Sequence, residues 1–249
     1  MSVKKPVRHE SSIQNPLFRF LEREINVACI LLDLVRDKVG DAKLMCEGKI
    51  QPLMELKTLA QTLYAGQVPK IWKKFTFLET LEVTPWISDL KKRLDQFETL
   101  VNTSDWQKKG VWLGGILFPE AFMTATRQYV AQNAQLSLDE LDLRACIYEG
   151  GEVEDDSFLI EGLGIEGGEW HGKSLSMSKE LANTVKTVKF TWIKINPEDK
   201  HRLSDQQIFV PVYLNSTRKN LLFSVKLDCG TIPRNNLYQR GIALIAWTL

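Results

Sequence analysis

The feature that most constrains this chain is a change in hydrophobic periodicity near residue 136. Before that point, apolar residues recur three and four positions apart, which is the spacing of one face of an α-helix. From Leu141 onward, short runs rich in valine, isoleucine, phenylalanine and tryptophan are separated by glycine, aspartate and asparagine clusters, the pattern of strands and turns. Helices and strands segregated in this way predict an α+β fold and exclude a doubly wound sheet, in which they would alternate.

The longest predicted helix begins at Asn15 and Pro16, because asparagine caps a helix well and proline suits its first turn. Its apolar stripe runs from Leu17 to Val39, and we predict that Gly40 ends this amphipathic helix after about 23 residues. Such a helix is about 35 Å long, more than one small domain needs to cover. Further helices are predicted over residues 42–47, 53–64, 85–101 and 119–132.

Six strands are predicted in the second half, over residues 141–148, 157–166, 187–195, 207–214, 220–228 and 241–248. Their spacing favours an antiparallel sheet that curls on itself into a closed or nearly closed β-barrel. The predicted organisation is therefore a tail or linker (1–14), a helical subdomain (15–135) and an antiparallel β-barrel subdomain (136–249).

Charge and composition exclude several classes of function. The 249 residues include 32 basic and 31 acidic side chains, so the net charge of +1 gives no field that would attract nucleic acid or a membrane surface. The longest apolar run, 111–118, is too short to span a bilayer. The four cysteines form no CxxC pair, which argues against a structural zinc site and suits a reducing cytosol.

One stretch matches a nucleotide-binding motif. Residues 167–174 fit the G-x4-G-K-[ST] pattern of a phosphate-binding loop, with Gly167, Gly172, Lys173 and Ser174 at its defining positions. That chemistry requires a long helix directly after the loop and a Mg²⁺-binding acid at the end of a second apolar strand. The segment after Ser174 is short and polar. A β-hairpin loop is the preferred prediction, and no cofactor is predicted for this segment.

No catalytic constellation is recognisable. The histidines at 9, 171 and 201 have no cysteine or serine partner at motif spacing, and the acidic cluster at 152–156 lacks a calcium-loop pattern. We therefore predict no catalytic residue, no metal site and no enzymatic activity for this chain.

Three stretches carry a family resemblance. Residues 15–24 (NPLFRFLERE) resemble the opening of the C-terminal region of dynein heavy chains, and 113–128 (LGGILFPEAFMTATRQ) are similar to its central signature. Residues 211–218 (PVYLNSTR), with 238–243 (YQRGIA), resemble the cytoplasmic form more than the axonemal ones. The stretches occur in the family's order over residues 15–249.

The resemblance implies a piece of a much longer, ATP-driven, minus-end-directed microtubule motor subunit, cytoplasmic and associated with the cytoskeleton. In that family, the segment follows the sixth AAA+ module, packs on the face of the ring opposite the linker, and carries no catalytic residues. Its implied partners are the AAA+ ring modules of the same heavy chain and, through the parent, the dynein complex and microtubules. ATP and Mg²⁺ would bind to the parent only. The implied role is to brace the ring and tune processivity and force, and the 162–172 loop aligns with a variable β-hairpin loop of the family.

Two alternatives remain open. One is a stand-alone β-barrel binding module with a helical dimerisation arm and a ligand at the barrel mouth. The other is a phosphate-loop nucleotide binder, for which titration with Mg·ATP and a Lys173→Ala variant would be decisive.

Overall fold

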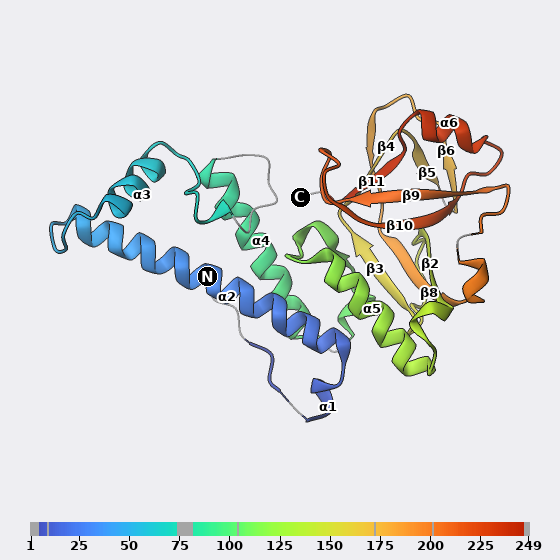
Figure 1. Cartoon of the computed structure of the whole chain (residues 1–249), viewed down its shortest axis with the longest axis horizontal. Helices are drawn as coiled ribbons and strands as arrows, with labels where there is room; N and C mark the ends of the chain where they lie inside the picture. Colours follow the sequence, from blue (N-terminus) through green and yellow to red (C-terminus); the bar gives the residue numbers. More distant parts are fainter. Residues whose placement is uncertain are drawn as a thin grey trace. The chain divides into compact units, whose positions relative to one another are not determined.

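The computed structural model describes residues 5–8, 10–73, 82–103, 105–171, 173–200 and 202–246 (Figure 1). The polypeptide divides into two compact units. The first comprises Met1–Val7 and Leu21–Asn102, and the second comprises Arg8–Phe20 and Thr103–Leu249. The α+β class is confirmed, whereas the subdomain limits at 14/15 and 135/136 stay predictions. None of the helices in the described ranges is both long enough and apolar enough to cross a membrane.

The helices agree closely with the predicted positions, except at the end of the first long one. They are α1 (Glu10–Ile13), α2 (Pro16–Cys46), α3 (Met54–Tyr64), α4 (Val83–Val101), α5 (Pro119–Ala134) and α6 (Arg234–Gln239). Asn15 caps α2 as predicted, because its side-chain Oδ1 accepts a hydrogen bond from the Leu17 amide at 2.9 Å. The short helices α1 and α6 were not predicted.

The prediction that Gly40 ends the first helix is wrong. Helix α2 is 31 residues long and continues past Gly40 through most of the separate helix predicted at 42–47. It ends at Cys46, and the backbone turns away at Gly48, whose φ of 71° lies in the left-handed region. There the Gly48 amide donates to the Met45 carbonyl (3.0 Å) and the Lys49 amide to the Leu44 carbonyl (2.9 Å), which together form a Schellman motif. A glycine inside a helix costs only about 1 kcal/mol, so Gly40 did not have to stop it.

The strands are β1 (Val111–Trp112), β2 (Leu141–Ile147), β3 (Ser157–Glu161), β4 (Leu163–Glu166), β5 (Glu169–His171), β6 (Ser174–Ser176), β7 (Ala182–Thr184), β8 (Val188–Lys194), β9 (Gln207–Tyr213), β10 (Leu221–Asp228) and β11 (Ala243–Ala246). Each of the six predicted runs contains strand structure, although the last residues of the final run lie outside the described part of the sequence. The run 157–166 is split into β3 and β4 at Gly162, where φ is +69°. The missed strands β1, β5, β6 and β7 have only two or three residues, too few to show an alternating pattern.

The sheet arrangement differs from the predicted six-stranded antiparallel barrel. The strands form one eleven-stranded mixed sheet in the order β1-β3-β8-β2-β10-β9-β11-β4-β7, with β6 pairing with both β5 and β10. Within the described residues the end strands β1 and β7 do not pair with each other, so the sheet is not closed. The pairs β1–β3, β2–β10, β6–β10 and β9–β11 are parallel.

The parallel pairing of β9 with β11 has a topological cause. Strands β9 and β10 form an antiparallel hairpin, and the following connection, which contains α6, returns the polypeptide so that β11 lies beside β9 in the same direction (Figure 1). Parallel neighbours always require such a crossover. Hydrophobic alternation identifies the buried face of a strand but not its neighbour, and the sequence pattern therefore could not reveal this pairing.

Helix α5 shares a hydrophobic core with the sheet. The ring centroids of Phe122 in α5 and Phe158 in β3 are 6.4 Å apart in an edge-on arrangement, and both side chains are buried. The indole Nε1 of Trp192 in β8 donates to the Thr126 hydroxyl of α5 at 3.0 Å. Phe122 and Thr126 of the 113–128 stretch, which carries the family resemblance, therefore help to build this core.

Candidate functional site

The three described positions of the phosphate-loop motif lie in a turn and a β-hairpin. Gly167 lies in the turn after β4, Lys173 lies at the tip of the β5–β6 hairpin and Ser174 begins β6, opposite His171 in the antiparallel register. Gly172 lies outside the described residues. A strand follows the loop where nucleotide chemistry needs a helix N-terminus, and the β-hairpin prediction is confirmed.

The titratable residues that were singled out from the sequence and that the structure describes form local surface contacts. His171 Nε2 lies 3.0 Å from Glu169 Oε2, and this hydrogen bond is the main reason why the pKa of Glu169 is lowered. In the acidic turn, a hydrogen bond to Asp155 raises the pKa of Lys108. His9 and His201 lie outside the described residues, and among those described no cluster of histidine, cysteine and carboxylate side chains is suited to a metal ion.

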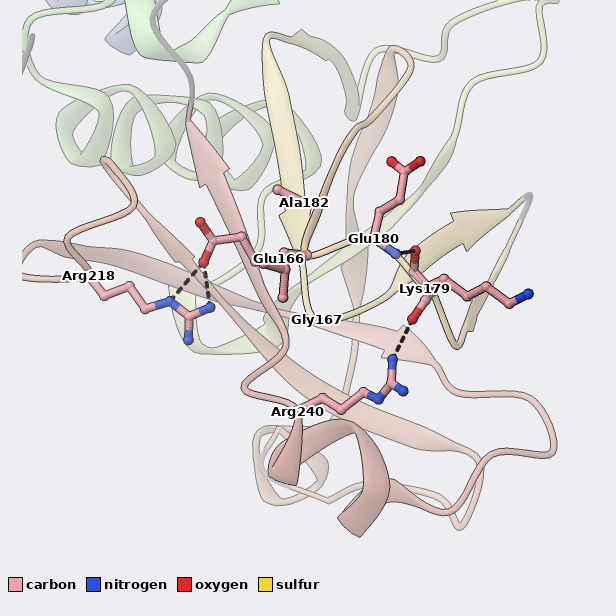
Figure 2. Close-up of a pocket in the computed structure, with 9 residues that line it drawn as sticks. Glu166, Gly167, Lys179, Glu180, Ala182, Arg218 and Arg240 are labelled. Atoms are coloured by element: carbon pink, nitrogen blue, oxygen red, sulfur yellow. Dashed lines mark hydrogen bonds and ion pairs between the residues drawn. The ribbon is translucent and has the colours of Figure 1, made fainter.

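The second unit contains a cleft of about 440 Å³ (Figure 2). Two arginines from the family-like stretches line it: Arg218 at the end of 211–218 and Arg240 within 238–243. The remaining lining residues are Glu166, Gly167, Ser178, Lys179, Glu180, Leu181 and Ala182. Figure 2 shows the two arginines on either side of Gly167. The structure thus brings together charged residues from separate segments of the sequence.

Arg218 is held by both local backbone structure and a long-range ion pair. It occupies the left-handed region with φ of 55°, at the end of a turn in which Asn215 Oδ1 accepts hydrogen bonds from the Thr217 amide (3.2 Å) and hydroxyl (2.6 Å). Its Nε and Nη2 both donate to Glu166 Oε2, at 3.1 and 2.6 Å. The left-handed conformation costs about 1–2 kcal/mol for a residue with a Cβ, and the charge-assisted hydrogen bonds help to offset this cost.

Arg240 fixes the opposite wall. Its Nη1 donates to the Ser178 carbonyl (Figure 2), while the buried Ser178 hydroxyl donates to Glu169 Oε1 at 2.9 Å. The same hydroxyl oxygen accepts from the Glu180 amide and from Asn183 Nδ2, each at 3.0 Å. The wall is therefore well ordered by hydrogen bonds.

Gly167 is required where these two walls meet. Its φ is +77°, and a Cβ at this position would lie 2.7 Å from the Arg240 carbonyl oxygen. Backbone atoms cannot withdraw as a flexible side chain does, so the cleft needs a glycine here. This requirement explains the first glycine of the motif without a bound nucleotide.

The first unit contains an apolar groove of about 420 Å³. Leu56 and Leu59 of α3 are buried at its base, whereas Met54 and Ile71 are 76% and 51% exposed. Its other lining residues are Lys38, Glu55, Thr58, Thr62, Pro69 and Lys70. Partly uncovered apolar surface of this kind is typical of an interaction site.

Sequence reasoning did not identify either surface as a site. Glu166 and Arg218 are 52 residues apart, and no local spacing rule connects them. The one available signal was that Arg218 and Arg240 are charged residues in family-like stretches whose other members are mostly apolar, polar or glycine. The groove gave no signal, because the exposed and buried apolar residues of α3 look alike in the sequence.

Comparison with known proteins confirms the predicted resemblance. The family model for the C-terminal domain of the dynein heavy chain matches residues 2–246. The cytoplasmic dynein heavy chains of Paramecium tetraurelia and Dictyostelium discoideum are 43% and 34% identical over 96% and 98% of this chain. The dynein axonemal heavy chain 1 of Mus musculus is 25% identical over 97%. The matched region spans only 5% or 6% of each relative's length.

Proposed function

Because the chain belongs to the family of C-terminal domains of dynein heavy chains, we propose that it caps the AAA+ ring of a cytoplasmic, cytoskeleton-associated dynein motor. In this proposal it braces ring modules and tunes processivity and force, and it performs no catalysis. The parent heavy chain supplies the ATP- and Mg²⁺-dependent, minus-end-directed movement along microtubules. The partners of this segment are then ring modules of the same heavy chain.

The observation that supports a docking role is the apolar groove of the first unit. The cytoplasmic relatives are about twenty times longer than this chain, so most of the parent polypeptide is available to cover Met54 and Ile71. Lys38, Lys70 and Glu55 also line the groove, and the excess of one positive charge favours an apolar partner surface with an acidic residue at its edge.

The free energy gained when a partner covers this groove would be large enough to change the ratio of ring conformations. Burying the exposed parts of Met54 and Ile71 contributes about 1–2 kcal/mol for each side chain. A contact of about 2–4 kcal/mol that forms in only one ring conformation changes the ratio of conformations by about 30-fold or more. A passive cap can therefore affect stepping without touching ATP.

The test is a double substitution, Met54→Lys with Ile71→Lys, in the complete heavy chain. Both side chains are exposed in this segment, so its own fold should tolerate lysine. We expect run length or stall force to change by about twofold or more while basal ATPase activity is retained. The matched control is Leu221→Lys, since Leu221 is 51% exposed, the same as Ile71, but lies in β10. Motility indistinguishable from wild type in the double variant would contradict the proposed role of the groove.

A further inference from the structure

The cleft of the second unit contains positive charge that its own fold does not neutralise. Arg218 is paired with Glu166, whereas the described acceptor of Arg240 is a neutral carbonyl group. In the part of the sequence that the structure describes, neither Arg240 nor Lys179 forms an ion pair. Figure 2 shows the Glu180 side chain directed away from both arginines. The cleft thus has donors suited to an incoming carboxylate.

The two arginines also retain donor capacity. A guanidinium group carries five N–H donors. Arg218 uses Nε and Nη2 toward Glu166, and Arg240 uses Nη1 toward Ser178. Among the described residues, the remaining guanidinium donors have no protein acceptor. Both side chains are already held in place, so a ligand would not bear the full entropy cost of ordering them.

An apolar side chain accompanies this charge. Leu181 lines the same cleft and is 90% exposed. Covering an aliphatic side chain that is this exposed lowers the free energy, because it removes apolar surface from water. A free phosphate or a small carboxylate would satisfy the arginines but leave Leu181 uncovered. An acidic residue next to an aliphatic residue in a peptide would satisfy both.

We propose that this cleft binds an acidic peptide segment. Glutamate or aspartate carboxylates of the segment accept hydrogen bonds from the remaining guanidinium donors of Arg240 and of Arg218, and a neighbouring aliphatic side chain packs on Leu181. The volume of about 440 Å³ falls within the range of small-ligand sites and accommodates a few side chains. This inference does not depend on the groove of the first unit or on the ring-capping proposal.

The test uses the 249-residue chain and a fluorescein-labelled peptide, acetyl-Leu-Glu-Leu-Glu-Leu-amide, with fluorescence polarisation at low salt. We expect saturable binding that weakens as salt is added, and little binding of the peptide in which both glutamates are replaced by glutamine. Arg240→Gln should weaken binding about tenfold, because it removes a charge-assisted hydrogen bond. Lys179→Gln should weaken it about threefold.

The controls distinguish a specific effect of the cleft residues from the loss of any positive charge and from misfolding of the variant. Arg202→Gln removes a surface arginine that hydrogen-bonds a neighbouring aspartate outside the cleft, and it should bind the peptide as wild type does. Lys179→Gln leaves the Arg240–Ser178 hydrogen bond intact, and thermal melts of both cleft variants report on folding.

Several outcomes would overturn the inference. These are the absence of saturable peptide binding, equal binding of the glutamine peptide, and unchanged affinity in folded Arg240→Gln. Full displacement of the peptide by equimolar inorganic phosphate, or binding of phosphatidylserine vesicles without peptide binding, would assign the cleft to a different anion.

Discussion

Loss of the buried carboxylate of Asp142 should destabilise the sheet more than loss of its partner, Lys226. Lys226 Nζ lies 2.8 Å from Asp142 Oδ2, and the two side chains are 2% and 12% exposed. The ion pair connects β10 to β2, two parallel strands whose backbone pairing places Lys226 opposite Arg144. The ammonium group also lies 5.5 Å from the Phe209 ring centroid. The ammonium group is therefore shielded from water and faces an aromatic ring as well as its carboxylate.

The asymmetry follows from what each substitution leaves behind. Asp142→Ala leaves a buried ammonium without its carboxylate, which costs about 3–5 kcal/mol. Lys226→Met leaves a carboxylate whose side chain is 12% exposed and has Arg144 Nη2 3.7 Å from its Oδ2, while methionine fills most of the space of the lysine stem. We expect that change to cost about 1–2 kcal/mol. The double variant should be more stable than Asp142→Ala alone, because no unpaired charge remains.

The assay is urea unfolding followed by tryptophan fluorescence, with the shift in midpoint converted to free energy at constant slope. If the two units unfold in separate transitions, the one that shifts is compared. Asp139→Ala is the control, because its side chain is 81% exposed and its ion pairs at 3.8 and 3.9 Å should contribute little. A larger destabilisation by Lys226→Met than by Asp142→Ala, or a double variant no more stable than Asp142→Ala, would refute the expected asymmetry.

Two further predictions concern a backbone position and a titratable group. Gly162→Ala should destabilise the fold by about 2–4 kcal/mol, since φ is +69° and the new Cβ would lie 2.3 Å from Trp112 Cδ1. Gly150 has a φ of +99° and open space around it, so Gly150→Ala should cost only the strain of the backbone conformation. Equal urea midpoints for the Gly162→Ala and Gly150→Ala variants would disprove the clash with Trp112. His171→Gln should return the pKa of Glu169 toward its ordinary value of 4.5, as read by carboxyl NMR titration. Because the pKa of Glu169 is lowered in the folded state, its carboxylate stabilises the fold fully above pH 4.5, and this contribution is lost as the pH falls through the folded pKa. A Glu169 titration that the substitution leaves unchanged would refute the role of His171.

Local structure was predictable where the deciding residues lie next to one another in the sequence. Asn15 followed by Pro16 marked the start of α2, amphipathic patterns located α3 and α4, and the Phe-Pro-Glu sequence at 118–120 marked the start of α5. Gly40 shows the limit of this reasoning. A glycine ends a helix only if the backbone turns left-handed there, and it was Gly48 that did so.

The sheet and the cleft could not be predicted in the same way. Runs rich in β-branched and aromatic residues located the strands, but the parallel pairing of β9 with β11 depends on the path of the connection through α6. The cleft depends on contacts such as Arg218 with Glu166, which join residues 52 positions apart. Loop closure and strand order decide which distant residues meet, and no short window of sequence contains that information.

The sequence by itself determined the α+β class, the positions of the long helices and main strands, and the dynein heavy chain family. These follow from periodicity and motifs, which are properties of contiguous residues. Only the tertiary structure decided that the sheet is mixed and open, that Arg218 and Arg240 line one cleft, and that Met54 and Ile71 stay exposed. Those features arise because side-chain burial and strand pairing are settled by packing between segments that are far apart in the sequence.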